Sequence, residues 1–253
     1  MKPSVDPIAQ SPLTDWHRRH GAHIDVCNGW RIAVRYPDES PARANALVDF
    51  AHCPTWELNG PRISETIADL CGGDVSVRSI HSGTAWQLYR LTTARAIVFG
   101  MPAGEMEGAL DVTGGWVSLV LVGPDSERIL NKVTAVDLRM VTLPVYGCCQ
   151  GPIFGVNTLF GRFPDRFELH ICGDSAEFLW EVLLDAGAEF GLKPVGVDFA
   201  GTRTEFNRDP TGERASRGDI PLVLLMAMHS HPTEAWNGCE RRQTPTRSPS
   251  GRG

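Results

Sequence analysis

One pattern occurs twice in this chain of 253 residues and limits the folds that it can adopt. Residues 56–80 and 119–143 each contain an apolar run, a Gly-Pro pair, a segment with helical spacing and a second apolar run. Proline suits the first position of a helix, where its missing N–H is not needed. We therefore expect each copy to form a strand, a turn, a helix and a strand. Two related α+β halves would explain the pattern, and two unrelated units that share a turn are the alternative.

The segments around this pattern indicate antiparallel sheets. Residues 22–36 alternate apolar and polar side chains on both sides of Asn28-Gly29, a dipeptide typical of two-residue hairpins. Residues 84–100 alternate in a similar way around Thr92-Thr93, which predicts a second pair of strands. We therefore expect an α+β fold with antiparallel sheets.

The distribution of apolar residues divides the chain into four parts. Residues 1–19 contain several prolines and few large apolar side chains, so we expect a flexible N-terminal arm. Residues 20–110 and 111–199 each hold one copy of the pattern and are predicted to be the first and second halves of one domain. Residues 200–253 begin with a polar stretch rich in helix breakers and end in a basic one, which predicts a mostly disordered C-terminal tail.

The composition argues against several classes of protein. A net charge of −6 provides no positive surface for nucleic acid or an anionic membrane. No apolar run reaches the length of a membrane span, and the first residues lack the apolar core of a signal peptide. Seven cysteines without a C-x-x-C pair are typical of a reducing compartment. We expect a cytoplasmic protein that binds neither nucleic acid nor a membrane.

No strong motif for a metal, a nucleotide or a nucleophile is present. His17, His20 and His23 are spaced by three, but no recognisable set of further ligands accompanies them, so we predict no metal site. His52 and Cys53 are adjacent, and neighbours in a strand point to opposite faces, which argues against a nucleophile and its base. The sequences GxGxxG, GxxxxGK[ST] and GxSxG are absent.

Carboxylates are the remaining candidates for a functional site. Glu168 lies between Phe167 and Leu169 in an apolar run. If those two side chains face the core, Glu168 faces the other side, toward either solvent or a cavity. A carboxylate in a cleft can accept the N–H groups of a heterocycle or stabilise a positive charge. Glu105 and Glu107 follow a predicted strand, where an exposed loop is the default expectation.

Four segments of the chain carry a family resemblance: HGAHIDVCNGWRIAVRY, LVDFAHCPTWELNGP, DVTGGWVSLVLVGPDSERILNKVTAVDL and RFELHICGDSAEFLWEVLLDAGAEFGLKPVG. In this order they resemble the folate-binding superfamily of the glycine-cleavage T-protein, an aminomethyltransferase. That superfamily includes the γ subunit of heterotetrameric sarcosine oxidase. The third segment resembles the sequence of that γ subunit. The resemblance covers about residues 20–198 and implies a fold of two pseudo-repeated α+β halves.

The resemblance implies roles for three residues. Glu168 matches a glutamate that helps bind the pterin of tetrahydrofolate, and Tyr89 matches a tyrosine near the folate channel. Glu107 falls at the position of the catalytic aspartate and keeps a carboxylate there. The resemblance thus implies a tetrahydrofolate-dependent transferase or demethylase that assists one-carbon transfer from a small N-methyl or aminomethyl donor.

The chain also departs from the family pattern. Gly100 stands where an asparagine is expected, LFGRFPD replaces a glycine-tyrosine-threonine-glycine-glutamate signature, and the tail has no counterpart of the family's C-terminal barrel domain. These departures favour an alternative function, a non-catalytic γ-like subunit of a heteromeric sarcosine oxidase-type amine oxidase. Its partners would be other oxidase or demethylase subunits. A truncated homologue with a foreign tail is the third interpretation.

Overall fold

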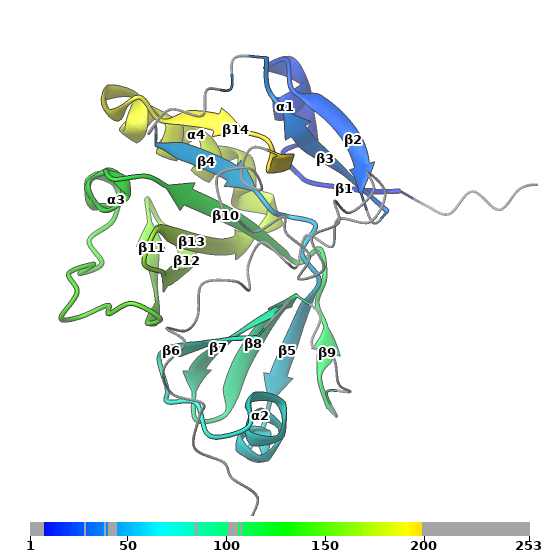
Figure 1. Cartoon of the computed structure of the whole chain (residues 1–253), viewed down its shortest axis with the longest axis vertical. Coiled ribbons are helices and arrows are strands. Elements are labelled where there is room, and N and C mark those ends of the chain that lie inside the picture. Colours follow the sequence, from blue (N-terminus) through cyan, green and yellow to red (C-terminus); the bar gives the residue numbers. More distant parts are fainter. Residues whose placement is uncertain are drawn as a thin grey trace, which may run out of the picture.

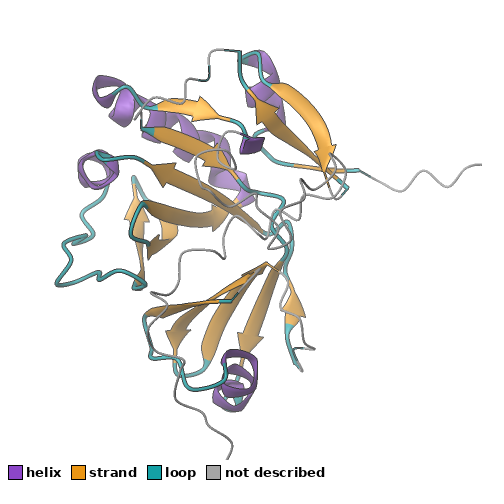
Figure 2. Cartoon of the chain, viewed as in Figure 1, coloured by secondary structure: helices purple, strands orange, loops and turns teal. Residues whose placement is uncertain are grey.

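The computed structural model describes residues 8–198, apart from residues 28, 38, 40–44, 84–85, 101–105 and 107. The described chain forms three β-sheets with helices packed against them, which confirms the α+β class (Figures 1 and 2). The predicted tail, residues 200–253, lies outside the described residues. None of the helices in the described part of the chain has the length and apolar character that crossing a lipid bilayer requires.

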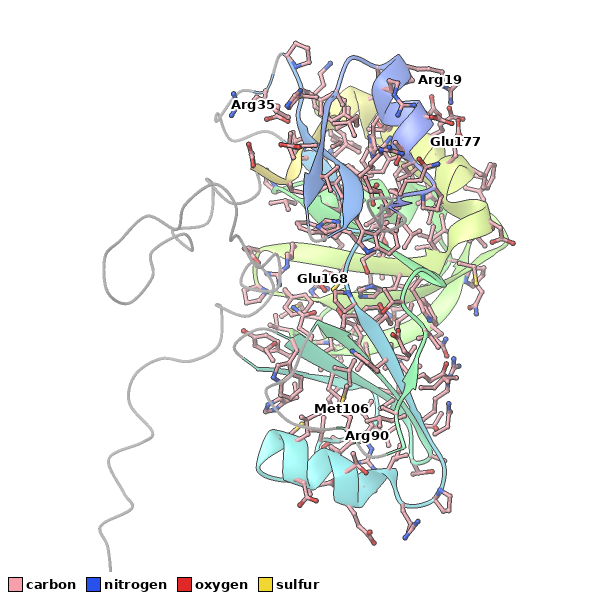
Figure 3. The ribbon with its side chains drawn as sticks, turned by 90° about the vertical axis from the view of Figure 1, so that its right-hand side faces the viewer. Arg19, Arg35, Arg90, Met106, Glu168 and Glu177 are labelled. Atoms are coloured by element: carbon pink, nitrogen blue, oxygen red, sulfur yellow. The ribbon has the colours of Figure 1, made fainter. Side chains whose placement is uncertain are left out.

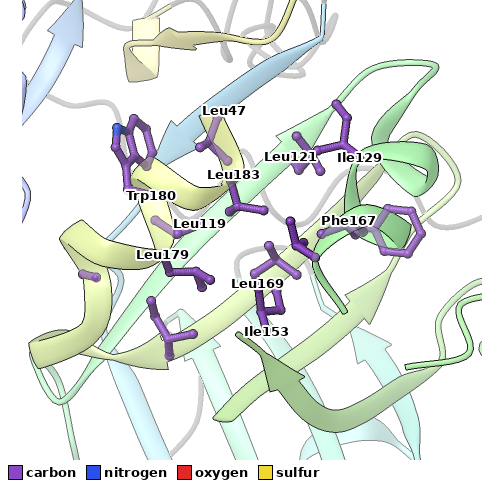
Figure 4. Packing of buried hydrophobic residues seen from close by; sticks show 14 of the residues in the cluster. Leu47, Leu119, Leu121, Ile129, Ile153, Phe167, Leu169, Leu179, Trp180 and Leu183 are labelled. Atoms are coloured by element: carbon purple, nitrogen blue, oxygen red, sulfur yellow. The ribbon is translucent and has the colours of Figure 1, made fainter. Parts of the chain in front are cut away.

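The largest sheet has six strands in the order β11-β12-β13-β10-β4-β14. All neighbours are antiparallel except β4 and β14, which are parallel. The strands are β4 (Ala46–Asp49), β10 (Trp116–Val122), β11 (Cys148–Ile153), β12 (Val156–Arg162), β13 (Arg166–Cys172) and β14 (Lys193–Val195). Helices α3 (Ser126–Val133) and α4 (Ala176–Gly187) cover one face, where Ile129 and Leu183 pack with Leu169 in a large apolar cluster (Figure 4). Short 3₁₀ turns, η1 (Gly173–Ser175) and η2 (Ala188–Phe190), flank α4.

A second sheet has five strands in the order β6-β7-β8-β5-β9, each antiparallel to its neighbours. The strands are β5 (Thr55–Asn59), β6 (Ser79–Ser82), β7 (Trp86–Thr92), β8 (Arg95–Gly100) and β9 (Leu110–Asp111). Helix α2 (Ile63–Cys71) covers one face, where Ile67 shares an apolar cluster with Leu58 and Val98. The pairing of β7 with β8 confirms the hairpin predicted for residues 84–100.

A third, small sheet lies near the N-terminus in the order β1-β3-β2. Its strands are β1 (Ala9–Gln10), β2 (His23–Cys27) and β3 (Trp30–Arg35). Strands β2 and β3 are antiparallel, which confirms the hairpin predicted at Asn28-Gly29.

The expected flexible arm over residues 1–19 is wrong for residues 9–19. These residues form β1 and helix α1 (Thr14–Arg19). Trp16 of α1 is buried with its ring centroid 5.5 Å from that of Trp180 on α4. A segment with few apolar residues is ordered here because one of them is a tryptophan that packs on the main core.

The two copies of the repeated pattern begin alike but end differently. Strand β5, a Gly-Pro turn and α2 correspond to β10, a Gly-Pro turn and α3. Gly60 and Gly123 of these turns both have positive φ, +119° and +130°. The strand predicted within 136–143 does not form, because Asp137 accepts hydrogen bonds from Arg139 and Thr142 and holds the segment in turns. That residues 20–110 and 111–199 are two related halves therefore remains a prediction.

The sheets do not follow the predicted boundary between residues 110 and 111. Strand β4 comes from the predicted first half but pairs with β10 of the second half, with Leu47 opposite Leu121. The chain then leaves the six-stranded sheet, builds the five-stranded sheet and returns at β10.

The helix-free faces of the two large sheets pack against each other. Their shared apolar cluster contains Leu91 and Ile97 from the five-stranded sheet and Val120 and Leu159 from the six-stranded sheet. Figure 1 shows the two sheets stacked one above the other, with α2 on the outer side of the lower one. The interface between them is thus an internal layer of the protein, and it contains the polar residues described next.

Candidate functional site

Glu168 lies at the centre of the interface between the two large sheets. The alternation of β13 turns Phe167 and Leu169 toward the helices, where both join the main apolar cluster. Glu168 therefore points to the opposite face, as the sequence predicted, and its exposed fraction is 0%. Of the two environments left open for it, solvent is excluded. Figure 3 shows Glu168 on the six-stranded sheet above the five-stranded sheet.

Three side chains donate hydrogen bonds to the Glu168 carboxylate. Arg166 Nε donates to Oε1 at 2.8 Å, and the Tyr89 hydroxyl donates to Oε2 at 2.8 Å. Gln87 Nε2 lies 3.4 Å from Oε1. Arg166 belongs to the same strand as Glu168, whereas Tyr89 and Gln87 come from β7 of the other sheet. The carboxylate thus joins the two sheets through a polar contact inside an apolar layer.

Tyr89 and Arg166 keep the protonation states that this contact requires. Burial and the negative charge of Glu168 raise the pKa of Tyr89 well above its usual value, so the hydroxyl remains a donor. Burial lowers the pKa of Arg166, but the nearby charges of Glu168 and Asp165 outweigh burial and raise it. The site therefore contains a buried ion pair with a neutral phenol beside it.

His170 extends the polar group along the same strand. Its Nδ1 lies 2.8 Å from the Ser118 hydroxyl, and its ring stacks on Phe99 with centroids 3.7 Å apart. Burial lowers the pKa of His170 to about 3, so the ring is neutral. Its Nε2 lies 3.8 Å from Glu168 Oε2 and has no hydrogen-bond partner among the described residues. One buried ring nitrogen in the site is therefore unsatisfied.

Gly161 provides the space that Tyr89 needs to reach Glu168. Gly161 is paired with Glu168 across β12 and β13. A Cβ atom at Gly161 would lie 2.5 Å from the Tyr89 hydroxyl oxygen, closer than real contacts allow. The glycine thus lets a side chain of the other sheet approach the backbone of this one.

The structure brings together two of the three predicted site residues, Glu168 and Tyr89, which are 79 positions apart in the chain. Glu107, predicted as the catalytic carboxylate, lies outside the described residues, as does Glu105. Sequence reasoning missed Arg166 and His170. Their spacing of two residues from Glu168 on a strand was the available signal, because it places all three on one face.

The predicted histidine and cysteine positions do not form a second reactive site. Burial lowers the pKa of His52 to about 4 and raises that of Cys53 to about 12, so the imidazole is neutral and the thiol stays protonated. The three histidines spaced by three separate: His17 is buried, and His20 stacks on Trp16. The described residues contain no cluster of three or more His, Cys, Asp or Glu side chains arranged to hold a metal ion.

A second buried polar cluster attaches the N-terminal sheet to β4. The Ser11 hydroxyl donates to Asp49 Oδ2 at 2.5 Å, and His17 Nε2 lies 3.0 Å from the same oxygen. The Tyr36 hydroxyl lies 2.5 Å from His17 Nδ1. Burial and the charge of Asp49 raise the pKa of Tyr36, which therefore keeps its proton. This chain of bonds explains why α1 is ordered on the six-stranded sheet.

Comparison with known proteins confirms the family resemblance seen in the sequence. Residues 105–207 match the model of the GCVT N-terminal domain. The chain is 25% identical over 231 residues to an aminomethyltransferase of Desulforamulus reducens, with 76% of this chain and 62% of that protein covered. It is 28% identical over 251 residues to an aminomethyltransferase of Alkaliphilus metalliredigens, with 84% and 68% covered. The chain thus corresponds to about two thirds of these relatives.

Two solved structures share the fold. One is the glycine cleavage system aminomethyltransferase T from Bartonella henselae, with a TM-score of 0.62 at 20% identity, covering 79% of this chain and 63% of that one. The other is a chain of the heterotetrameric sarcosine oxidase from Corynebacterium sp. U-96, with a TM-score of 0.52 at 18% identity. That match covers 59% of this chain and 86% of the other.

Proposed function

We propose that this chain binds tetrahydrofolate at Glu168 and assists one-carbon transfer of the aminomethyltransferase type. The observation that carries the proposal is the 2.8 Å hydrogen bond between Tyr89 and Glu168. The family resemblance connects both residues with folate, and their contact across two sheets was not visible in the sequence. Two residues that are far apart in the sequence, and that the resemblance assigns to one ligand, therefore contact each other in the structure.

The chemistry of the buried residues fits a ligand with N–H groups. A carboxylate offers about four acceptor positions, and Glu168 uses two at 2.8 Å and one at the weak distance of 3.4 Å. The unsatisfied Nε2 of His170 is a further polar atom at this position. A pterin ring carries N–H donors that such a carboxylate accepts. Phe99, stacked on His170, adds an aromatic surface beside the site.

The residues of this chain would act by binding and orientation. Glu168 would hold the pterin edge, and Tyr89 would fix the carboxylate that receives it. A buried carboxylate binds more strongly than a solvated one because the surroundings do not screen it. Tetrahydrofolate, when bound, supplies the acceptor for the one-carbon unit. Orienting two reactants at a fixed position lowers the barrier without covalent chemistry from the protein.

Glu107 completes the proposal from the sequence alone. Its carboxylate would stabilise positive charge on a small N-methyl or aminomethyl donor. It follows β8, the strand that pairs with Tyr89's strand β7.

Calorimetric titration with tetrahydrofolate tests the proposal. We expect saturable binding to the wild-type protein. The affinity of Glu168→Gln should be lower by about tenfold or more, since the amide lacks the negative charge that strengthens a hydrogen bond from an N–H donor. Glu177→Gln is the matched control, because Glu177 is an exposed glutamate on α4 that pairs with Arg19. Equal affinity of Glu168→Gln and the wild-type protein would remove Glu168 from the site.

The alternative function, a non-catalytic subunit of an amine oxidase, is supported by the match that covers 86% of one chain of a heterotetrameric sarcosine oxidase. In that case the buried ion pair of Glu168 with Arg166 would stabilise the fold and bind nothing. Expression alone and with candidate oxidase subunits distinguishes the two. A stable monomer that binds tetrahydrofolate supports the first function, and insolubility without partner subunits supports the second.

A further inference from the structure

We propose that Arg166 is an internal competitor for the ligand at Glu168, so that ligand binding requires the guanidinium to leave the carboxylate. This inference rests on the proposed function and assigns a residue that sets the affinity of the same site. Both Glu168 oxygens already accept a hydrogen bond at 2.8 Å, and the carboxylate has no exposed surface.

A planar ligand edge with two adjacent N–H groups needs an acceptor position on each Glu168 oxygen. Three of the about four positions of the carboxylate are already used, so one of the present donors must move before such an edge can bind. Tyr89 is poorly suited to move, because it is fully buried and its ring packs edge-on against Phe99 and His170 at 5.3 and 4.9 Å. Its hydroxyl also fits closely over Gly161. Tyr89 is therefore the fixed donor of the pair.

Arg166 is the donor that can move, because a second ion-pair partner lies beside it. Its side chain is 10% exposed and lies over the Phe163 ring, 4.1 Å from its centroid. A second carboxylate, Asp165, lies 3.1 Å away and is 38% exposed at the protein surface. Arg166 can thus release Glu168 and keep an ion pair with Asp165, which reduces the penalty for separating the buried charges.

The chemistry of the guanidinium also indicates which ligands can replace it. Arg166 offers a planar edge of N–H donors. A neutral planar heterocycle with adjacent ring N–H and amino groups offers a similar edge to the same carboxylate. Because the internal donor occupies the site in the free protein, the apparent affinity falls in proportion to the fraction of open molecules.

Substitution of Arg166 tests this inference against a matched arginine. Arg166→Ala removes the competitor, and Arg162→Ala is the control, because Arg162 is 11% exposed, lies 4.9 Å from the Phe167 ring and pairs with Glu127 rather than Glu168. We expect Arg166→Ala to bind tetrahydrofolate about tenfold more tightly than wild type, while Arg162→Ala binds like wild type. If Arg166→Ala does not fold, Arg166→Met keeps the stem on Phe163 and serves the same comparison.

A second measurement separates this inference from the proposed function. Methylguanidinium should raise the melting temperature of Arg166→Ala, because it can take the place of the missing guanidinium beside Glu168. It should not raise the melting temperature of Arg162→Ala, nor that of the double variant that combines Arg166→Ala with Glu168→Gln. Binding by the wild-type protein with no gain in Arg166→Ala overturns the inference and leaves the proposed function intact. Absence of tetrahydrofolate binding in every variant, with rescue by methylguanidinium, overturns the proposed function and the competition at Glu168, and shows only that a free guanidinium can take the place of the Arg166 side chain. Absence of both binding and rescue overturns both.

Discussion

Two buried carboxylates, Glu168 and Asp49, show how one residue type is accommodated in different ways within one fold. Glu168 is neutralised by an arginine of its own strand, and a tyrosine of the other sheet donates to it. The Asp49 carboxylate is instead hydrogen-bonded to the Ser11 hydroxyl and the His17 imidazole of the N-terminal segment and to the backbone N–H of Ala51. Each carboxylate therefore stabilises a contact between parts of the chain that are distant in sequence.

Asp49→Asn should destabilise the protein at neutral pH. Burial alone would raise the pKa of Asp49, but hydrogen bonds from His17 and Ser11 outweigh it and lower the pKa below its usual value. A lowered carboxyl pKa gives stability that is present above about pH 3.9, the unfolded value, and is lost as the pH falls through the folded-state pKa. We expect the free energy of unfolding to fall by about 2–3 kcal/mol at pH 7.

Urea denaturation at pH 7 and below pH 4 measures this effect. The difference between wild type and Asp49→Asn should shrink as the pH falls below about 3.9, because the unfolded chain binds a proton at Asp49 there before the folded protein does. Asp15→Asn is the control, because Asp15 forms an exposed pair with Arg18 worth less than about 1 kcal/mol. A difference for Asp49→Asn that is independent of pH would contradict the role assigned to its charge.

At the scale of elements, the alternation of β13 predicted the direction of Glu168 but not its environment. The period of two fixes which face of a strand a side chain occupies. What lies opposite that face depends on the packing of a sheet formed 79 positions earlier, at Tyr89. Local pattern contains no information on that packing, which is why solvent and cavity remained open in the sequence.

The elements that the sequence failed to predict have local physical causes. Residues 136–143 are rich in apolar side chains, but Asp137 organises them into turns in which Leu138 and Leu143 are buried and Val141 is exposed. Helix α1 is only six residues long, so its hydrophobic periodicity is too short to identify. By contrast, the hairpins and the helices α2, α3 and α4 have clear turn or periodic signals.

The two Gly-Pro turns allow a matched test of the repeated elements. Gly60 and Gly123 both have positive φ, so alanine is strained at either position. Only at Gly123 would the added Cβ collide with a neighbour, 2.3 Å from Asn45 Oδ1, and that side chain accepts a hydrogen bond from the Asp125 N–H. At Gly60 no atom lies within 4 Å.

We expect Gly60→Ala to lower the free energy of unfolding by about 1–2 kcal/mol and Gly123→Ala by about 1–3 kcal/mol more. Chemical denaturation of both variants gives the comparison. Equal losses at the two positions would show that backbone strain alone matters and that the contact of the second turn with Asn45 does not.

At the scale of the whole molecule, the chain forms one structure in which the predicted halves share elements. Strand β4 is separated from its neighbour β10 in sequence by the whole five-stranded sheet. The two large sheets then meet through an apolar layer with Glu168 and Tyr89 inside it. A ligand bound at this layer would contact both sheets, so folding and binding depend on the same interface.

The central claim is that Glu168 and Tyr89 form one ligand site. A double-mutant cycle in tetrahydrofolate affinity, with Glu168→Gln, Tyr89→Phe and the double variant, tests it most directly. We expect each single change to weaken binding about tenfold and the double variant to bind no more weakly than Glu168→Gln, because Tyr89 acts through the carboxylate. Losses that multiply to about a hundredfold would show independent action, and unchanged affinity in all three variants would place the ligand elsewhere.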